Sequence, residues 1–119
     1  MDSQREIERK YKALLHDVAT NDFYKVDLSN RVNCYMCQVC NLITKTIDVD
    51  SGVTPFIHTC EHCGNIAHSS FYQDIAPNLK PTQEWFRPSL KEVLKMRKKP
   101  GLLDHILQGG LDVRKIMVS

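Results

Sequence analysis

Two Cys-x-x-Cys steps carry the clearest chemistry in this chain. The first runs from Cys37 to Cys40 and the second from Cys60 to Cys63, and nineteen residues separate them. Two thiolates spaced by two residues can bind one metal ion from a tight turn, and two such turns supply the four soft ligands that tetrahedral Zn²⁺ accepts. We therefore expect one structural Zn²⁺ per chain, bound by these four cysteines.

A fifth cysteine, Cys34, leaves the register of the first step open, because Cys34 and Cys37 have the same spacing. In such turns the residue after the second cysteine takes a left-handed conformation, which glycine adopts freely and asparagine tolerates. Gly64 follows the second step and Asn41 follows the pair at 37 and 40, whereas Gln38 follows Cys37. The pair at 37 and 40 is therefore favoured, and Cys34 stays an alternate ligand.

Three histidines lie beside the cysteines: His58 and His62 flank Cys60, and His68 lies five residues beyond the second step. Each can replace a cysteine as ligand or polarise a water molecule, or can be an ordinary exposed or hydrogen-bonded side chain. A catalytic zinc keeps an open coordination position, which four thiolates would fill. A zinc deaminase has a His-x-Glu ahead of its cysteine pair, and this chain has none. We therefore expect no enzymatic activity.

The composition indicates one domain of a soluble protein. The chain has 119 residues, of which 42% are hydrophobic and 25% are charged, an ordinary balance for a globular domain. No stretch approaches the roughly 20 apolar residues that cross a membrane, and the charged start does not resemble a signal peptide. Clustered cysteines without an export signal favour metal binding in a reducing cytoplasm over disulfides.

Positive charge is concentrated near the C-terminus. Residues 1–79 contain seven Lys and Arg against ten Asp and Glu, while residues 80–119 contain nine against four. In a helix after residue 88 the lysines would share one face, which makes a phosphate-contacting stripe possible. A solvated face of an amphipathic helix would have the same pattern. The candidate nucleic-acid contacts are Arg87, Lys91, Lys95, Lys98 and Lys99.

A helix is predicted over residues 3–19. Ser3 and Glu6 have the spacing of a capping box. Five apolar residues follow at helical spacing, namely Ile7, Tyr11, Leu14, Leu15 and Val18. This stripe must be buried against the ribbon or against a second copy, so a homodimer through this helix is one possibility.

The rest of the chain predicts a small sheet followed by two helices. Strands are expected at 42–49 and 53–59, joined by a turn at 50–52, with a third strand at 66–72. After a proline-containing loop at 76–81, one helix should run from 88–89 to Pro100 and another from 102 to 108. The tail 111–119 has no clear pattern. The predicted fold is α+β, a zinc ribbon with a three-stranded antiparallel sheet, one N-terminal helix and two C-terminal helices.

We divide this single domain into an N-terminal helix and lead-in (1–31), a ribbon (32–75) and a C-terminal part with the loop, the basic helix, the short helix and the tail (76–119).

Around the ribbon the chain resembles small uncharacterised zinc-ribbon proteins of bacteriophages and prophages. The resemblance covers roughly residues 34–110 and rests on five segments, Cys37-x-x-Cys40, Asp48-x-Asp50-x-Gly52-Val53-Thr54-Pro55-Phe56, Cys60-x-x-Cys63-Gly64, Ser69-Ser70-Phe71-Tyr72 and Pro81-x-x-Glu84-Trp85-Phe86-Arg87-Pro88. The chain departs from that pattern at Asn41, where glycine is usual, and in its extra Cys34.

The resemblance implies a phage-type protein that docks on host or viral machinery in the host cytoplasm. It supplies no established activity. We therefore expect a zinc-binding, non-catalytic protein whose partner is another protein. The alternative is a nucleic-acid-binding module that uses the basic C-terminal helix, with weak binding expected because a zinc-loaded chain is close to neutral. We expect no membrane contact.

Overall fold

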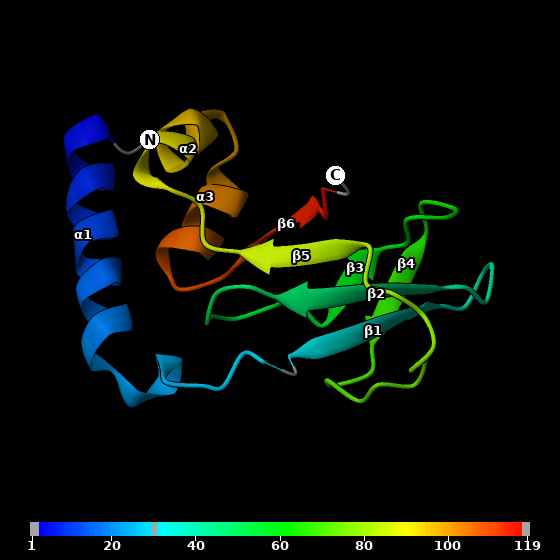
Figure 1. Ribbon diagram of the computed structural model, residues 1–119. Helices are drawn as coiled ribbons and strands as arrows, with labels where there is room; N and C mark the ends of the chain where they lie inside the picture. Colours follow the sequence, from blue (N-terminus) through cyan, green and yellow to red (C-terminus); the bar gives the residue numbers. More distant parts are fainter. Residues whose placement is uncertain (1–2, 30, 118–119) are drawn as a thin grey trace.

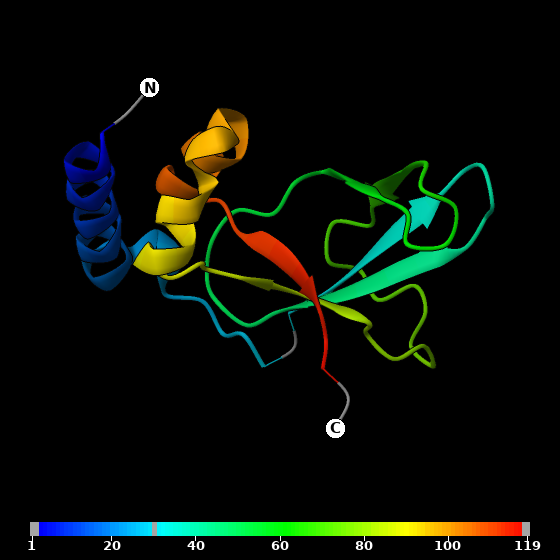
Figure 2. The same cartoon turned by 90° about the horizontal axis from the view of Figure 1, so that it is seen from above.

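The structure, a computed structural model, describes residues 3–29 and 31–117. It is an α+β fold in which three α-helices gather at one end of a six-stranded mixed sheet that curls into half a barrel (Figure 1). The view from above shows the same separation between a helical end and a sheet end (Figure 2). The α+β class and the three helices agree with the sequence analysis, but the prediction of a small three-stranded ribbon is wrong.

The N-terminal helix α1 spans Gln4–Thr20 and is followed by a short 3-10 turn, η1, at Asp22–Tyr24. Its N-cap is Ser3, whose side chain accepts a hydrogen bond from the backbone N–H of Glu6, as the capping pattern predicted. Of the apolar stripe, Ile7, Tyr11 and Leu14 are buried. Ile7 and Tyr11 pack against the C-terminal helices of the same chain, and not against the ribbon as one alternative required.

The C-terminal helices are α2, at Leu90–Lys95, and α3, at Pro100–Leu107, with a 3-10 turn η2 at Met96–Lys98 between them. Ser89 and Glu92 form the predicted capping box at the start of α2. The α-helix is shorter than predicted because η2 interrupts it before Pro100. Together with α1 these helices bury a separate core, which consists of Ile7, Tyr11, Val93, Leu103 and Ile106.

The sheet has the strand order β3-β4-β1-β2-β5-β6. Its strands are β1 (Val32–Cys37), β2 (Ile43–Asp48), β3 (Ile57–Thr59), β4 (Ile66–Ser69), β5 (Gln83–Phe86) and β6 (Asp112–Lys115). All neighbouring strands are antiparallel except β2 and β5, which are parallel. Three strands, β1, β5 and β6, were not predicted, and β3 and β4 are shorter than predicted.

The predicted hairpin between 42–49 and 53–59 is also wrong. The chain instead crosses from β2 to the far edge of the sheet, where β3 pairs only with β4. On the way, Val53 donates a backbone hydrogen bond to Gly109 and accepts one from Leu111, at 3.0 and 2.8 Å. A Cβ atom on Gly52 would lie 2.7 Å from the Gly109 carbonyl oxygen. Gly52 therefore permits a close backbone approach, where the sequence indicated a hairpin turn.

The core of the sheet forms around Trp85 in β5. Its side chain is 3% exposed, its ring packs near Tyr35 and His58, and its indole N–H donates to the Thr46 hydroxyl at 3.0 Å. Phe86 is buried as well. Both aromatic residues belong to a strand that pairs with β2 and β6.

Candidate metal centre

Two β-hairpins position the four cysteines. Cys37 is the last residue of β1, and Cys40 lies in the turn that leads to β2. Cys60 and Cys63 lie in the turn between β3 and β4. Because β4 pairs with β1, the hairpins lie side by side, and both turns are at the end of the sheet that points away from the helices (Figure 1).

The four sulfur atoms form one cluster, in which every pair of Sγ atoms lies within 4.8 Å. The Sγ atoms of Cys37 and Cys63 are 3.5 Å apart, and those of Cys40 and Cys60 are 3.6 Å apart. These distances exceed the disulfide bond length of about 2.05 Å. Around a tetrahedral zinc with Zn–S bonds of about 2.3 Å, sulfurs are separated by roughly 3.8 Å. The cluster can hold one metal ion, and its four thiolate donors suit zinc.

The two turns repeat one backbone design. Asn41, with φ of 62°, and Gly64, with φ of 79°, both take the left-handed conformation that the sequence analysis expected after the second cysteine. Their amides donate to the carbonyl groups of Cys37 and Cys60, at 2.9 and 3.0 Å. This geometry supports the pair at 37 and 40 as the first half of the site.

Hydrogen-bond donors surround the sulfurs of the second turn. The side-chain amide of Asn65 donates to the Cys63 sulfur at 3.3 Å, and the backbone N–H of His62 lies 3.4 Å from the Cys60 sulfur. The side-chain and backbone N–H groups of Asn65 lower the pKa of Cys63 to about 6. A thiolate is the form that binds metal, so Asn65 assists the site. Asn65 is not identified by the sequence analysis, because the sequence offers only its position two residues after Cys63.

Asn65→Ala should lower the zinc affinity about tenfold, because loss of a donor to a ligating sulfur weakens that ligand. Competition with a chelator of known zinc affinity measures the change. Asn78→Ala, in an exposed loop, is the matched control and should leave the affinity unchanged. An Asn65→Ala affinity equal to that of the control would contradict this role.

Cys34 lies outside the cluster. It is three residues before Cys37 in β1, so the two side chains point to opposite faces of the sheet. Its side chain is fully buried, and its sulfur lies 3.9 Å from an oxygen of Asp74. Lys45 pairs with the same carboxylate at 2.9 Å. Cys34 therefore packs beneath the loop that contains Asp74, away from the ion site.

The three neighbouring histidines are also outside the four-cysteine cluster. The His58 ring packs between Tyr35 and Trp85 in the sheet core, and its Nε2 atom lies 2.8 Å from the Gln83 side-chain oxygen. His62 contacts the backbone carbonyl of Ile43 at 3.2 Å. The His68 side chain lies on the exposed face of β4, beside Phe56. Each histidine therefore makes its contacts outside the sulfur cluster.

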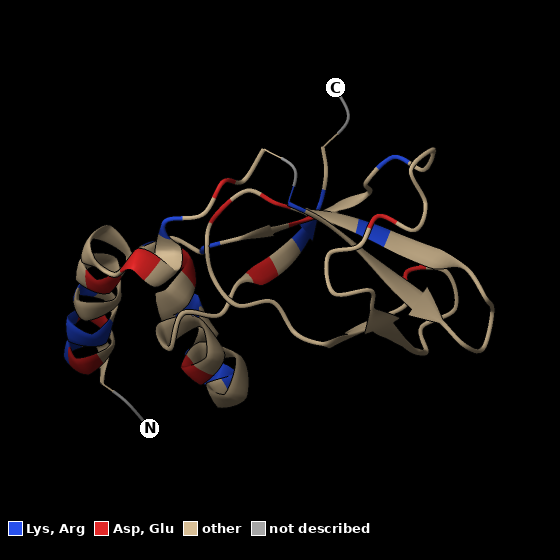
Figure 3. Ribbon diagram, turned by 90° about the horizontal axis from the view of Figure 1, so that it is seen from below, with Lys and Arg blue, Asp and Glu red and all other residues tan. Residues whose placement is uncertain are grey.

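The candidate nucleic-acid contacts separate into two groups. Arg87 is half-buried, its guanidinium group donates to the Ser51 carbonyl and lies 5.6 Å from the Tyr24 ring centre, and its amide donates to Asp50 at 2.7 Å. Arg87 thus joins the start of the helical part to the 50–52 segment. The other four, Lys91, Lys95, Lys98 and Lys99, are exposed. Figure 3 shows acidic residues interspersed with basic ones along the helices.

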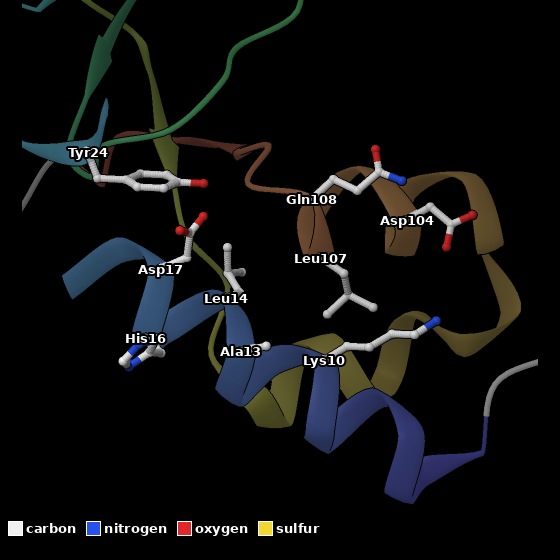
Figure 4. A pocket seen from close by; sticks show the side chains of 9 residues that line it. All are labelled: Lys10, Ala13, Leu14, His16, Asp17, Tyr24, Asp104, Leu107 and Gln108. Carbon is white, nitrogen blue, oxygen red and sulfur yellow. The ribbon is translucent and has the colours of Figure 1, made fainter. Parts of the chain in front are cut away.

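A groove of about 600 Å³ lies between α1 and α3, at the helical end (Figure 4). Leu14 and Leu107 supply apolar surface, and Asp17, Tyr24 and Gln108 supply polar groups. The groove is at the opposite end of the molecule from the cysteine cluster. Its charged side chains are of both signs, which distinguishes it from a phosphate site.

No family model matches the chain, and neither a curated protein nor a solved structure matches it. Within residues 3–29 and 31–117, no helix is long and apolar enough to cross a membrane.

Proposed function

We propose that this chain is a zinc-binding, non-catalytic protein that docks on a partner protein, as a phage-type factor acting on host or viral machinery. The observation that carries the proposal is the cluster of four thiolates. Four protein ligands complete a tetrahedral zinc shell and leave no position for a water or a substrate, which is the arrangement of a structural site. A reducing cytoplasm, where thiols stay free, suits such a site.

The sheet end supplies a surface for a partner. Several large apolar side chains at the sheet end are exposed, among them Val39, Phe56, Ile57, Ile66 and Phe71. Isolated exposed apolar residues are ordinary, but a contiguous group often marks an interaction site. This surface supports protein binding over catalysis.

Affinity capture from a bacterial lysate tests the proposal. The tagged, zinc-loaded protein should retain a specific protein after nuclease treatment, and the bound protein is identified by mass spectrometry. The same protein after zinc removal serves as the control, because a partner that needs the folded sheet end should be lost. Recovery of nothing beyond the control, or of nucleic acid alone in a parallel capture without nuclease, would contradict the proposal.

Nucleic-acid binding is the second candidate, and the exposure of Lys91, Lys95, Lys98 and Lys99 favours it. If these lysines contact phosphates, the logarithm of the affinity for duplex DNA should fall with the logarithm of salt concentration, with a slope of about −0.9 per neutralised phosphate. We expect only weak binding at about 150 mM salt, because acidic residues outnumber basic ones in residues 1–79 and Arg87 is engaged within the chain.

A variant in which these four lysines are replaced by Gln should flatten the slope and keep the melting temperature, since all four side chains are exposed. Filter binding or fluorescence anisotropy with random-sequence DNA and RNA gives both quantities. Submicromolar binding of the unmodified protein at about 150 mM salt, lost in this variant, would favour the nucleic-acid function over protein docking.

A further inference from the structure

The exposed face of the sheet carries a continuous set of apolar and aromatic side chains. Met36 in β1, His68 in β4 and Ile57 in β3 are register partners, so their side chains form one row across three strands. Ile66 lies on the same face, two residues before His68. The Phe56 ring lies 6.0 Å from the His68 ring and 4.9 Å from the Phe71 ring, measured between ring centres. We call this set the outer face.

The backbone holds Phe71 outward. Phe71 and Tyr72 have φ values of 56° and 64°, the left-handed region that residues other than glycine rarely adopt. The turn is fixed by the fully buried Asn33, whose side-chain oxygen accepts the Tyr72 amide at 3.0 Å, and by Ser69, whose hydroxyl accepts the Phe71 amide at 3.0 Å. In this strained, well-held turn the Phe71 side chain stays 70% exposed. Such strain often marks a functional position.

Beside the outer face, β3 is an edge strand of the sheet formed by the described residues. Phe56 accepts a hydrogen bond from Ser69, and Cys60 donates one to Asn65. In an antiparallel pair the residues that bond to the neighbouring strand alternate. The backbone groups of Ile57 and Thr59 therefore point away from β4, at the edge of the sheet. An extended segment can add there as a further strand.

The end of β3 is acidic, because the exposed Glu61 follows Cys60 there and no Lys or Arg lies between Lys45 and Lys80 in the sequence. The other acidic residues of that range interact elsewhere: Asp48 pairs with Arg31, Asp74 pairs with Lys45, and Asp50 accepts the Arg87 amide. Cys60 directly follows β3, and four thiolates around one Zn²⁺ carry a net charge of −2. A partner segment whose charge complements this edge is therefore basic.

We propose that the β3 edge and the outer face bind an extended, basic segment of a partner protein as an additional strand. Its alternate apolar side chains would contact Phe56 and Phe71, and its Lys or Arg side chains would lie near the cysteine turn. The proposal rests on the proposed docking function and names the surface and the chemistry of the partner.

A second copy of this chain fits the outer face less well. Six partly exposed side chains of this size present on the order of 500 Å², whereas a stable dimer needs about 800 Å² per partner. A single peptide strand needs less area, because backbone hydrogen bonds contribute to its binding.

The test uses the zinc-loaded protein, labelled with ¹⁵N, and an eight-residue synthetic peptide of alternating Lys and Val. We expect saturable binding at peptide concentrations below about 1 mM, with the largest amide shifts at Ile57, Thr59 and Phe71. A peptide with Glu in place of Lys should bind at least about tenfold more weakly. N-methylation of alternate peptide amides should abolish binding, because it removes the donors that pair with the edge.

Two variants of the protein test the site itself. Phe71→Asn removes the aromatic ring and keeps a residue that tolerates the left-handed conformation, so it should weaken binding about tenfold. Phe23→Asn is the matched control, since Phe23 is also exposed but lies in η1, and it should leave the affinity unchanged. Zinc content and melting temperature show that both variants are folded.

Three results would overturn the proposal: no saturable shifts, shifts centred on the helices, or equal affinity of the Phe71→Asn and Phe23→Asn proteins. Repeating the lysate capture with the Phe71→Asn protein separates this proposal from the docking function. If the partner is still captured, docking stands and the outer face is not its site. If no partner is captured by the unmodified protein, the docking function itself fails.

Discussion

Removal of zinc from the native protein by a chelator should unfold the sheet end of the molecule. Cys37 and Cys60 are buried in the same core as Tyr35 and Trp85, so an ion bound by the four cysteines would join two hairpins to this core. Structural zinc sites of this kind contribute about 10 kcal/mol or more to folding. Small domains are stable by about 5–15 kcal/mol in total. Loss of the ion is therefore comparable to the entire stability of the chain.

Trp85 fluorescence reports unfolding of the sheet end directly, because Trp85 is the only tryptophan and is buried in that core. Its fluorescence should move to longer wavelength as the chelator removes the metal, and circular dichroism should show loss of strand structure. The same chelator, already saturated with zinc, is the control and should have no effect. Unchanged Trp85 fluorescence in protein proven to be metal-free would contradict a folding role for the site.

Trp85→Ala should destabilise the zinc-loaded protein by about 3–5 kcal/mol, the usual cost of deleting a large buried aromatic side chain. Its ring fills the space beside Tyr35 and His58, and its indole N–H bonds to the buried Thr46 hydroxyl. The variant therefore creates a cavity and also removes a buried hydrogen bond. Urea unfolding followed by circular dichroism gives the free energy of unfolding.

Trp85→Phe separates the two contributions. It keeps most of the ring volume and removes the indole donor, so a smaller loss, about 1–3 kcal/mol, is expected. Phe23→Ala, at an exposed aromatic position, is the control for aromatic loss outside the core. A Trp85→Ala protein whose unfolding free energy matches that of the control would show that β5 does not hold the sheet together.

The local features of this fold could be predicted from the sequence. The geometry of one short turn determines the cysteine spacing and the residue that follows each cysteine pair. Asn41 and Gly64 are these residues, and both are left-handed in the structure. The helix starts at Ser3 and Ser89 likewise depend on hydrogen bonds to the residue three positions later. Interactions of this range leave a clear pattern in the sequence.

The sheet could not be predicted because its signals are non-local. Strand β5 is four residues long and pairs in parallel with β2, and β6 is a mostly polar strand with two exposed residues, so neither has the alternation that indicates a strand. Strand β1 is buried on both faces, since Asn33, Cys34 and Tyr35 are all inaccessible. Asp50-Ser51-Gly52 has the composition of a turn, but the close approach of Gly109 determines its conformation.

The metal content of the purified, folded protein tests the central claim most directly. Elemental analysis of the unmodified protein should find one zinc per chain. Cys34→Ser should keep that zinc, because the Cys34 sulfur lies outside the cluster, and Cys40→Ser should lose it. Folded protein without metal would contradict the account, and so would a Cys34→Ser protein that releases zinc while Cys40→Ser retains it.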